Sequence, residues 1–336
     1  MSRTWIVVPA LVFTAACGSH TPVTPTPVAN APQIACPADM TIHGITGASQ
    51  AVTYSAPTVT GGTSPVTTSC TQASGASFSL GTTSVSCTAS DAMARQAACS
   101  FNVTLTALAL SVTKYETVGD SFTAGENGEP GFIDTPNAYP TKLQNRFDTT
   151  YPNQGVVVIN RGHNGDPIEL TVSQLDGFLA ADKPGAVLIL SGFNNLADGC
   201  GNGPVNTRLC QDAITQVKLG VRDCIHRSKE LPATVLYVFV STLTPPGPVL
   251  AGAAHDRRIS SDAIVQANAQ IRQTVAAEGA TLADPYPLFL GHEAEYVDTD
   301  GLHLRPAGYQ VLADTFFAAI TSKIPQTPLF TLNGLR

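Results

Sequence analysis

Residues 117–125 read TVGDSFTAG, and they place Ser121 at the point where a short strand is expected to end. Aromatic and β-branched residues at 115–118 favour the strand, and Gly119-Asp120 is typical of a turn. A serine at the mouth of a strand, where a turn leads into a helix, can be both exposed and rigidly held. Gly-Asp-Ser is also common turn chemistry, so a nucleophilic Ser121 depends on partners elsewhere in the chain.

The chain around and beyond this serine alternates strands with helices. Apolar runs that predict fully buried strands lie at 156–159, 186–190 and 235–240. Between the strands, Asp166-Pro167 is typical of a helix start, with an N-cap followed by proline. This alternation predicts a parallel sheet covered on both faces, with ligands at the carboxyl ends of the strands. Ser121 lies at such an end.

The composition is that of a compact protein and excludes some partners. The 336 residues suffice for two domains with sizeable cores, and 43% are hydrophobic against 13% charged. The net charge of -7, with only 18 Lys+Arg, gives no basic patch for nucleic acid or anionic lipid. We therefore expect no nucleic-acid partner.

Residues 1–16 are typical of an export signal, with Arg3 followed by an apolar run too short to span a bilayer. The small residues that end at Cys17 resemble the cleavage box of bacterial lipoproteins, which would make Cys17 the lipidated first residue of the mature protein. Thr14 stands where that box usually has leucine, so simple secretion is the alternative. The expected location is the cell envelope, anchored in the outer or cytoplasmic membrane by this lipid alone, or the exterior.

Two segments separate this signal from the strand that leads to Ser121. Residues 17–33 are Thr/Pro-rich, which favours a semi-rigid, extended spacer. At 34–108 charge nearly vanishes, and period-2 alternation predicts a small all-β sandwich. Its cysteines are Cys36, Cys70, Cys87 and Cys99. Their surroundings, such as CPAD from Cys36 and ACSFNVT around Cys99, resemble a hyalin repeat (HYR). The resemblance implies an immunoglobulin-like fold associated with adhesion or spacing, and two disulfides whose pairing stays open.

A nucleophilic serine needs a base, a group that orients the base, and donors for an oxyanion. The candidate base is His303, in the stretch VDTDGLHLRP at 297–306. Asp300 lies three residues earlier, and Gly301 allows a tight turn in which the carboxylate accepts from the nearer imidazole nitrogen. Asp298 is the alternative orienter, at a spacing that is less suited.

Two further stretches follow predicted strands and offer oxyanion donors. Residues 160–166 read NRGHNGD and present the backbone N–H of Gly165. Residues 191–195 read SGFNN and present the side-chain amide of Asn194. Each alone is the pattern of an ordinary loop, but together with the serine and histidine stretches they form a set in a definite order.

The order GDS, NxGxxGD, GxN and DGxH resembles the SGNH (GDSL) hydrolase superfamily over residues 112–322. The resemblance implies a three-layer α/β/α, flavodoxin-like hydrolase domain with a parallel sheet, here at 109–336. It implies that the nucleophile, base and orienter are Ser121, His303 and Asp300. It also implies that the oxyanion donors are the N–H groups of Ser121 and Gly165 and the amide of Asn194. Asn195 departs from the family, which usually has aspartate at that position.

The implied activity is hydrolysis of carboxylic esters of short acyl or acetyl groups by a Ser-His-Asp triad, through an acyl-enzyme. Acetylated polysaccharide and lipid are both open as substrates, and the protein is expected to act as a monomer without a cofactor. No cysteines and histidines cluster at metal-ligand spacing, so no metal is expected. The alternative function is a surface adhesion or carbohydrate-binding protein whose hydrolase-like domain is inactive.

The remaining cysteines and one long loop lie within the hydrolase-like part of the chain. Cys200 and Cys210 bracket a short loop and are expected to pair. Cys224, on an apolar helix face, is expected to be a buried free thiol. The Pro/Gly-rich segment 244–258 follows a predicted strand, so it is expected to form a rim or lid beside the active face.

Overall fold

The computed structural model describes residues 30–230, 234–251, 253 and 256–328. The predicted signal, Cys17 and most of the Thr/Pro-rich spacer lie outside these described residues. The described residues form two compact units. The first contains residues up to Cys36, Ala56–Thr71 and Ser86–Ser100, and the second contains Pro37–Ser55, Gln72–Val85 and the chain from Phe101 onward. Strand β8 (Gln96–Leu110) runs without a break through the domain boundary expected at residue 108, so that boundary remains a prediction.

Strands dominate residues 30–110. Antiparallel pairs join β1 (Gln33–Ala35) to β4 (Thr58–Thr60), β3 (Ser49–Ala51) to β6 (Ser77–Ser79), and β5 (Thr67–Cys70) to β7 (Gly81–Ser90). Strand β8 pairs in parallel with β2 (Met40–Ile45) and antiparallel with β14 (Gln326–Pro328). Alternate residues such as Val85, Phe101 and Val103 are buried, as the period-2 pattern predicts.

Within the described residues, disulfides link three pairs of cysteines, Cys36–Cys99, Cys70–Cys87 and Cys200–Cys210. The first two represent one of the pairings that the sequence leaves open. Cys224 is buried and has no disulfide partner among the described residues, and burial raises the pKa of its thiol to about 12. Disulfides of this kind are typical of proteins in an oxidising compartment. In the described part of the chain, no helix combines the length and the apolar character that crossing a membrane requires.

The α/β part is built on a five-stranded parallel sheet in the order β10-β9-β11-β12-β13. Its strands are β9 (Lys114–Gly119), β10 (Val157–Gly162), β11 (Ala186–Leu190), β12 (Tyr237–Ser241) and β13 (Thr281–Ala283). Of these five strands, β9 comes first in the chain and lies second in the sheet, which is the flavodoxin-like order and confirms the predicted fold class. The direction of winding reverses between β9 and β11, and Ser121 follows the end of β9.

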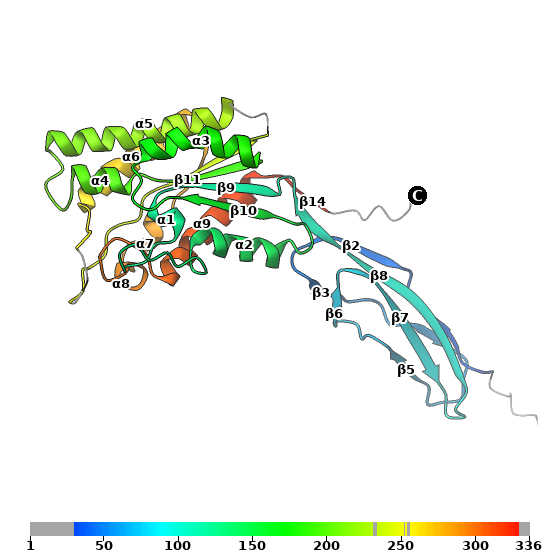
Figure 1. Cartoon of the computed structure of the whole chain (residues 1–336). Helices are drawn as coiled ribbons and strands as arrows, with labels where there is room; N and C mark the ends of the chain where they lie inside the picture. Colours follow the sequence, from blue (N-terminus) through cyan, green and yellow to red (C-terminus); the bar gives the residue numbers. More distant parts are fainter. Residues whose placement is uncertain (1–29, 231–233, 252, 254–255, 329–336) are drawn as a thin grey trace, which may run out of the picture. The chain divides into compact units, whose positions relative to one another are not determined.

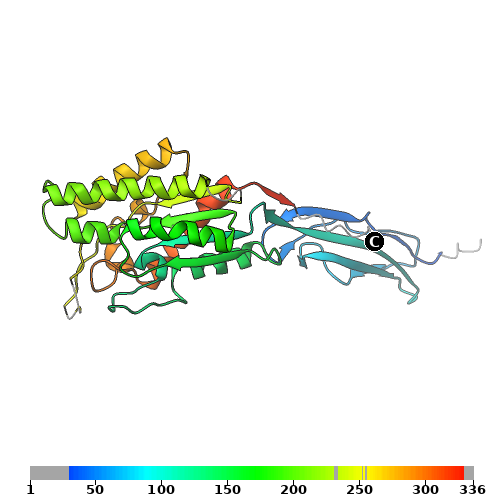
Figure 2. The same cartoon turned by 45° about the horizontal axis from the view of Figure 1, so that its top comes forward.

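Helices cover both faces of this sheet, as Figures 1 and 2 show. One face carries α3 (Ile168–Asp182), α5 (Arg208–Glu230) and α6 (Ser261–Ala277), with α4 (Phe193–Gly199) packed on α5. The other face carries α2 (Tyr139–Thr150) and α9 (Pro306–Lys323). The short helices are α1 (Ser121–Ala124), α7 (Tyr286–Phe289) and α8 (Glu293–Tyr296). Strand β11 is buried throughout, because it lies at the centre of the sheet with helices on both sides.

Two local predictions are wrong. The run at 156–159 is predicted to be fully buried, but β10 is an edge strand, and Val157 is 45% exposed. Asp166 is predicted to cap a helix, but α3 begins at Ile168 after Pro167, with no side-chain cap. The Asp166 carboxylate accepts instead from the amide of Gln174 at 3.2 Å.

Strand β9 also carries a buried carboxyl group, that of Glu116. This side chain is fully buried, and neither of its oxygens has a hydrogen-bond partner among the described residues. Burial raises the pKa of Glu116 from 4.5 to about 7, with the charge of Asp182 adding to the rise and those of Arg161 and Lys114 opposing it. Folding therefore favours the protonated form of Glu116.

We expect Glu116→Gln to remove a pH-dependent loss of stability. Between pH 4.5 and about 7 the folded chain keeps a proton on Glu116 that the unfolded chain has released, so stability falls as pH rises through this window. The shift corresponds to roughly 2–3 kcal/mol of stability between pH 5 and pH 8. Urea unfolding of the wild type and the variant at both pH values measures it. Glu129→Gln, in an exposed loop, should leave the pH dependence as it is; an equal dependence in wild type and Glu116→Gln would contradict the expectation.

Candidate active site

The turn that carries Ser121 lies tightly against the end of β11. Gly119 has φ +154°, and a Cβ at this position would lie 1.8 Å from the carbonyl oxygen of Leu190. Only glycine fits there, because the backbone conformation and the contact both exclude a side chain. Helix α1 then begins directly at Ser121, and the Asp120 side chain caps it by accepting from the Phe122 N–H at 3.1 Å.

Asp120 joins this turn to the start of α4. Its second carboxylate oxygen accepts from the backbone N–H groups of Gly192, at 3.2 Å, and Phe193, at 3.3 Å. Burial raises the pKa of Asp120 to about 7, although these backbone donors favour the charged form. The ring of Phe193 stacks on that of Phe122, with centroids 3.7 Å apart. Asp120 therefore connects the turn of Ser121 with the SGFNN stretch at 191–195.

The second half of the site is the turn that leads into α9. Oδ1 of Asp300 accepts from the backbone N–H groups of Leu302 and His303, each at 3.0 Å. Gly301, which directly follows Asp300, has φ +77°, where a side chain is strained. Oδ2 of Asp300 is then free to accept from Nδ1 of His303, at 2.6 Å.

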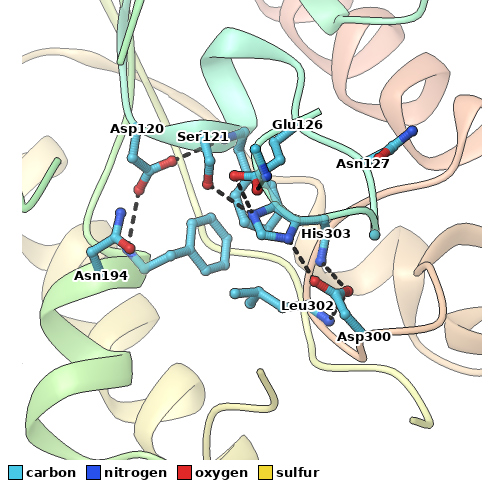
Figure 3. Close-up of polar contacts among 12 residues, drawn as sticks. Asp120, Ser121, Glu126, Asn127, Asn194, Asp300, Leu302 and His303 are labelled. Carbon is cyan, nitrogen blue, oxygen red and sulfur yellow. Dashed lines mark hydrogen bonds and ion pairs between the residues drawn. The ribbon is translucent and has the colours of Figure 1, made fainter. Parts of the chain in front are cut away.

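The two halves meet at the imidazole of His303. Its Nε2 lies 3.0 Å from Oγ of Ser121, although the two residues are 182 positions apart in the chain. Figure 3 shows the unbroken series from Ser121 through His303 to Asp300. The side chains of His303 and Asp300 are 2% and 3% exposed, so water competes little for these contacts. The structure thus brings the three predicted triad residues together.

A backbone segment holds the Asp300 turn from outside. Within the predicted rim 244–258, the N–H groups of Gly247 and Leu250 donate to the carbonyls of Gly301 and Thr299, at 3.0 and 3.1 Å. The N–H of Arg257 donates to the carbonyl of Asp300 itself at 3.0 Å. The segment therefore lies beside the active face, as predicted, and holds the backbone of the turn that carries Asp300.

The alternative orienter, Asp298, does not contact the imidazole. Its oxygens accept from the backbone N–H groups of Thr299, at 2.7 Å, and Gly128, at 3.1 Å. The geometry therefore favours Asp300 over Asp298 as the partner of His303.

The predicted oxyanion donors come from two neighbouring loops. Asn194 lies in the first turn of α4, and its amide donates to the carbonyl of Asp166 at 3.1 Å. This contact ties Asn194 to the loop of Gly165, which is exposed and has φ +82°. No hydrogen bond between described residues joins Gly165 or Asn194 to Ser121. In Figure 3, Asn194 lies on the opposite side of Ser121 from His303.

Asn195, the departure from the family pattern, is fully engaged. Its carbonyl oxygen accepts from the Ile168 N–H at 2.9 Å, and its amide donates to Glu169 at 2.8 Å. An aspartate would accept the first bond but would repel the Glu169 carboxylate. The amide therefore suits this chain and holds the loop firmly against α3.

Sequence reasoning missed one residue of the site, Glu126. It follows α1 by two positions, and its side chain is 2% exposed. Its Oε2 lies 3.2 Å from Nε2 of His303. The only signal in the sequence is a carboxylate close behind the serine, and nothing in the four stretches points to it.

The electrostatics of His303 follow from these contacts. Burial alone lowers the pKa of the imidazole, but the hydrogen bonds of Asp300 and Glu126 outweigh burial and raise the pKa to about 9. Conversely, although burial raises the pKa of the Asp300 carboxyl, the hydrogen bond and charge of His303 bring it below its ordinary value. Asp300 is therefore a carboxylate across the physiological pH range.

Within the described residues, no group of histidine, cysteine, aspartate and glutamate side chains is arranged to hold a metal ion.

Comparison with known proteins decides the family. Residues 117–311, more than half of the chain, match the model of the GDSL-like Lipase/Acylhydrolase family. The chain belongs to this family. Membership makes it a carboxylic ester hydrolase, as the sequence analysis expects. Residues 29–105 match the HYR domain, which confirms the second resemblance.

Three solved structures are similar to this GDSL-like member. A lipase/acylhydrolase from Enterococcus faecalis is 20% identical, with a TM-score of 0.47, and the match covers 63% of this chain and 97% of that one. An acetylxylan esterase from Geobacillus stearothermophilus is 18% identical, with a TM-score of 0.47 and coverage of 62% and 94%. A gut microbial diltiazem-metabolizing enzyme is 18% identical, with a TM-score of 0.51 and coverage of 63% and 48%. No curated protein matches the chain.

Proposed function

We propose that this protein hydrolyses esters of short acyl groups, such as acetyl esters, with Ser121, His303 and Asp300 as its catalytic triad. The observation that carries the proposal is the buried series Ser121 Oγ, His303 and Asp300, with contacts of 3.0 and 2.6 Å. Nucleophile, base and orienter at hydrogen-bond distance are the arrangement that activates a serine hydroxyl.

The first half of the reaction forms an acyl-enzyme. Neutral His303 takes the hydroxyl proton at Nε2 while Ser121 Oγ attacks the ester carbonyl carbon. The N–H groups of Ser121 and Gly165 and the amide of Asn194 donate to the tetrahedral oxyanion. The intermediate collapses, the carbon–oxygen bond to the alcohol breaks, and the alcohol leaves with the proton from Nε2.

The second half repeats these steps with water. His303 takes a proton from water, whose oxygen attacks the acyl carbon, and the same donors hold the second oxyanion. The bond to Ser121 then breaks, the carboxylic acid leaves, and Oγ recovers its proton. Asp300 keeps the imidazole in the required tautomer and stabilises its charged form throughout.

The loops beside the triad favour small acyl groups. The described parts of the rim 244–258 form no helix and offer no long apolar lid that would cover a fatty chain. Acetylated polysaccharide and short-chain lipid both remain candidates for the ester. Rates across an acyl-length series, with acetylated xylan included, would rank them.

The cellular setting belongs to the same proposal. The three disulfides suit export, and the sequence favours a lipid anchor at Cys17 over simple secretion. The HYR domain would then serve as a spacer between the envelope and a monomeric hydrolase domain.

Labelling with a fluorophosphonate tests the proposal directly. The reagent phosphonylates a serine only where a base and oxyanion donors activate it, so we expect one adduct on the peptide that contains Ser121. Mass spectrometry of the labelled full-length protein locates the adduct, and denatured protein serves as the control. Absence of the adduct would overturn the proposal and favour a carbohydrate-binding or adhesion protein whose hydrolase-like domain is inactive.

A further inference from the structure

The base nitrogen of His303 faces two acceptors. Nε2 lies 3.0 Å from Ser121 Oγ and 3.2 Å from Oε2 of Glu126. Figure 3 shows both contacts meeting at the same ring nitrogen, with Asp300 at the other one. The imidazole therefore lies between two carboxylates, both almost fully buried.

Glu126 is fixed in this position by its own surroundings. Its Oε1 accepts from the Gly131 N–H at 2.8 Å, and its backbone N–H donates to the Ser121 carbonyl at 2.9 Å. The hydroxyl of Tyr309, on α9, donates to the Glu126 carbonyl. Among the described residues, Oε2 has no partner except His303. The imidazole of His303 is thus the one polar group among the described residues that compensates the burial of Oε2.

A second carboxylate at Nε2 affects the step that starts catalysis. The base must be neutral to take the serine proton, and each carboxylate favours the charged imidazolium instead. A pKa of about 9 for His303 leaves about one molecule in a hundred with a neutral base at pH 7.

We propose that Glu126 is a positioning residue that holds the base side of His303 and sets a more alkaline working range than Asp300 alone would give. The proposal rests on the proposed triad mechanism. In the resting enzyme Glu126 shares Nε2 with Ser121, and the pH at which the imidazole becomes free depends on its carboxylate.

Other charged and titratable groups also face the imidazole and Glu126, but they stay constant when only Glu126 is changed. They are Asp300 in the turn before α9, Tyr309 on α9, Asp120 at the end of β9, and Arg257 in the rim segment. A Glu126→Gln variant keeps the size of the side chain and an oxygen that can accept from Gly131. At Nε2 it replaces the carboxylate oxygen by an amide NH₂, which removes the negative charge and can donate only to a neutral imidazole.

The test compares the wild type with Glu126→Gln by two measurements on the full-length protein. The first follows the ring of His303 by NMR of ¹⁵N-histidine-labelled protein across pH, with His303→Gln identifying its signals. The second follows kcat/KM for p-nitrophenyl acetate against pH, with Ser121→Ala protein as the blank. We expect the titration of His303 and the acid limb of kcat/KM to move together to lower pH by at least one unit. At pH 7 the variant would then be about tenfold faster.

Glu129→Gln is the matched control, because it removes the same charge from the same loop at an exposed position. We expect it to leave both profiles unchanged. A His303 titration and an acid limb that stay in place in Glu126→Gln, or that move equally in Glu129→Gln, would overturn the role of Glu126. Should Glu126→Gln not fold, Glu126→Asp, which withdraws the carboxylate by one methylene, carries the same test.

Failure of the triad mechanism has a different signature. The NMR titration needs no turnover, so it reports on Glu126 even in an inactive protein. A wild type that neither hydrolyses the ester nor takes up the fluorophosphonate would count against the proposed function. An unmoved histidine titration counts against Glu126 alone.

Discussion

Replacing Ser121 by alanine is expected to lower kcat/KM for p-nitrophenyl acetate by about 10⁶-fold, because members of a triad act as a unit. Without Oγ no acyl-enzyme forms, and only oxyanion donors and His303 remain to assist direct attack by water. Initial rates above the spontaneous hydrolysis, together with the loss of the burst of p-nitrophenol, measure the effect.

The matched control for this variant is Ser173→Ala, on the exposed side of α3. Its hydroxyl bonds only the Leu170 carbonyl of its own helix, so its loss should leave the rate unchanged. Circular dichroism should show that both variants fold. Full hydrolysis by pure Ser121→Ala protein would refute a nucleophilic Ser121.

Asp300→Asn is expected to lower kcat by about 10⁴-fold while leaving the turn intact. The amide oxygen can still accept from the Leu302 and His303 N–H groups, as Oδ1 does at 3.0 Å. The amide NH₂, however, cannot accept from Nδ1 of His303, so the imidazole carries its proton on Nε2 and cannot take one from Ser121. Steady-state kinetics with p-nitrophenyl acetate checks the prediction.

Asp298→Asn separates the two candidate orienters. Asp298 bonds the N–H groups of Thr299 and Gly128, and an amide oxygen can keep at least one of these contacts. We therefore expect a much smaller loss than for Asp300→Asn. The reverse ranking of the two variants would assign the orienting role to Asp298.

The sequence predicts the fold and the triad because both depend on local patterns. Strand β11 is found within its observed bounds, since a wholly apolar run of five residues is typical of a central parallel strand. The turn at Asp300 and His303 is equally local. The spacing of three positions and the glycine at 301 determine whether the Asp300 carboxylate reaches Nδ1 of His303. Such features need no knowledge of distant parts of the chain.

The features that sequence reasoning missed depend on neighbours from elsewhere in the chain. An apolar run cannot reveal whether its strand ends up central or at an edge, and so β10 was expected to be buried. The three-residue strand β13 is too short for a periodic signal. Glu126 contacts His303 only because the turn before α9 brings the histidine to it. A glutamate that follows a glycine in the sequence does not indicate this contact.

The distance along the chain between Ser121 and His303 has a consequence for how the enzyme is made. The serine leaves the ribosome long before its base, because synthesis proceeds from the N-terminus and 182 positions separate the two. An alcohol without its base is a poor nucleophile, so on the proposed mechanism the nascent chain carries an inert hydroxyl at Ser121. On the proposed triad, hydrolytic power requires that α9 has docked, because the turn before this helix carries His303. Esterase activity would therefore report that the parts of the chain around Ser121 and His303 have come together.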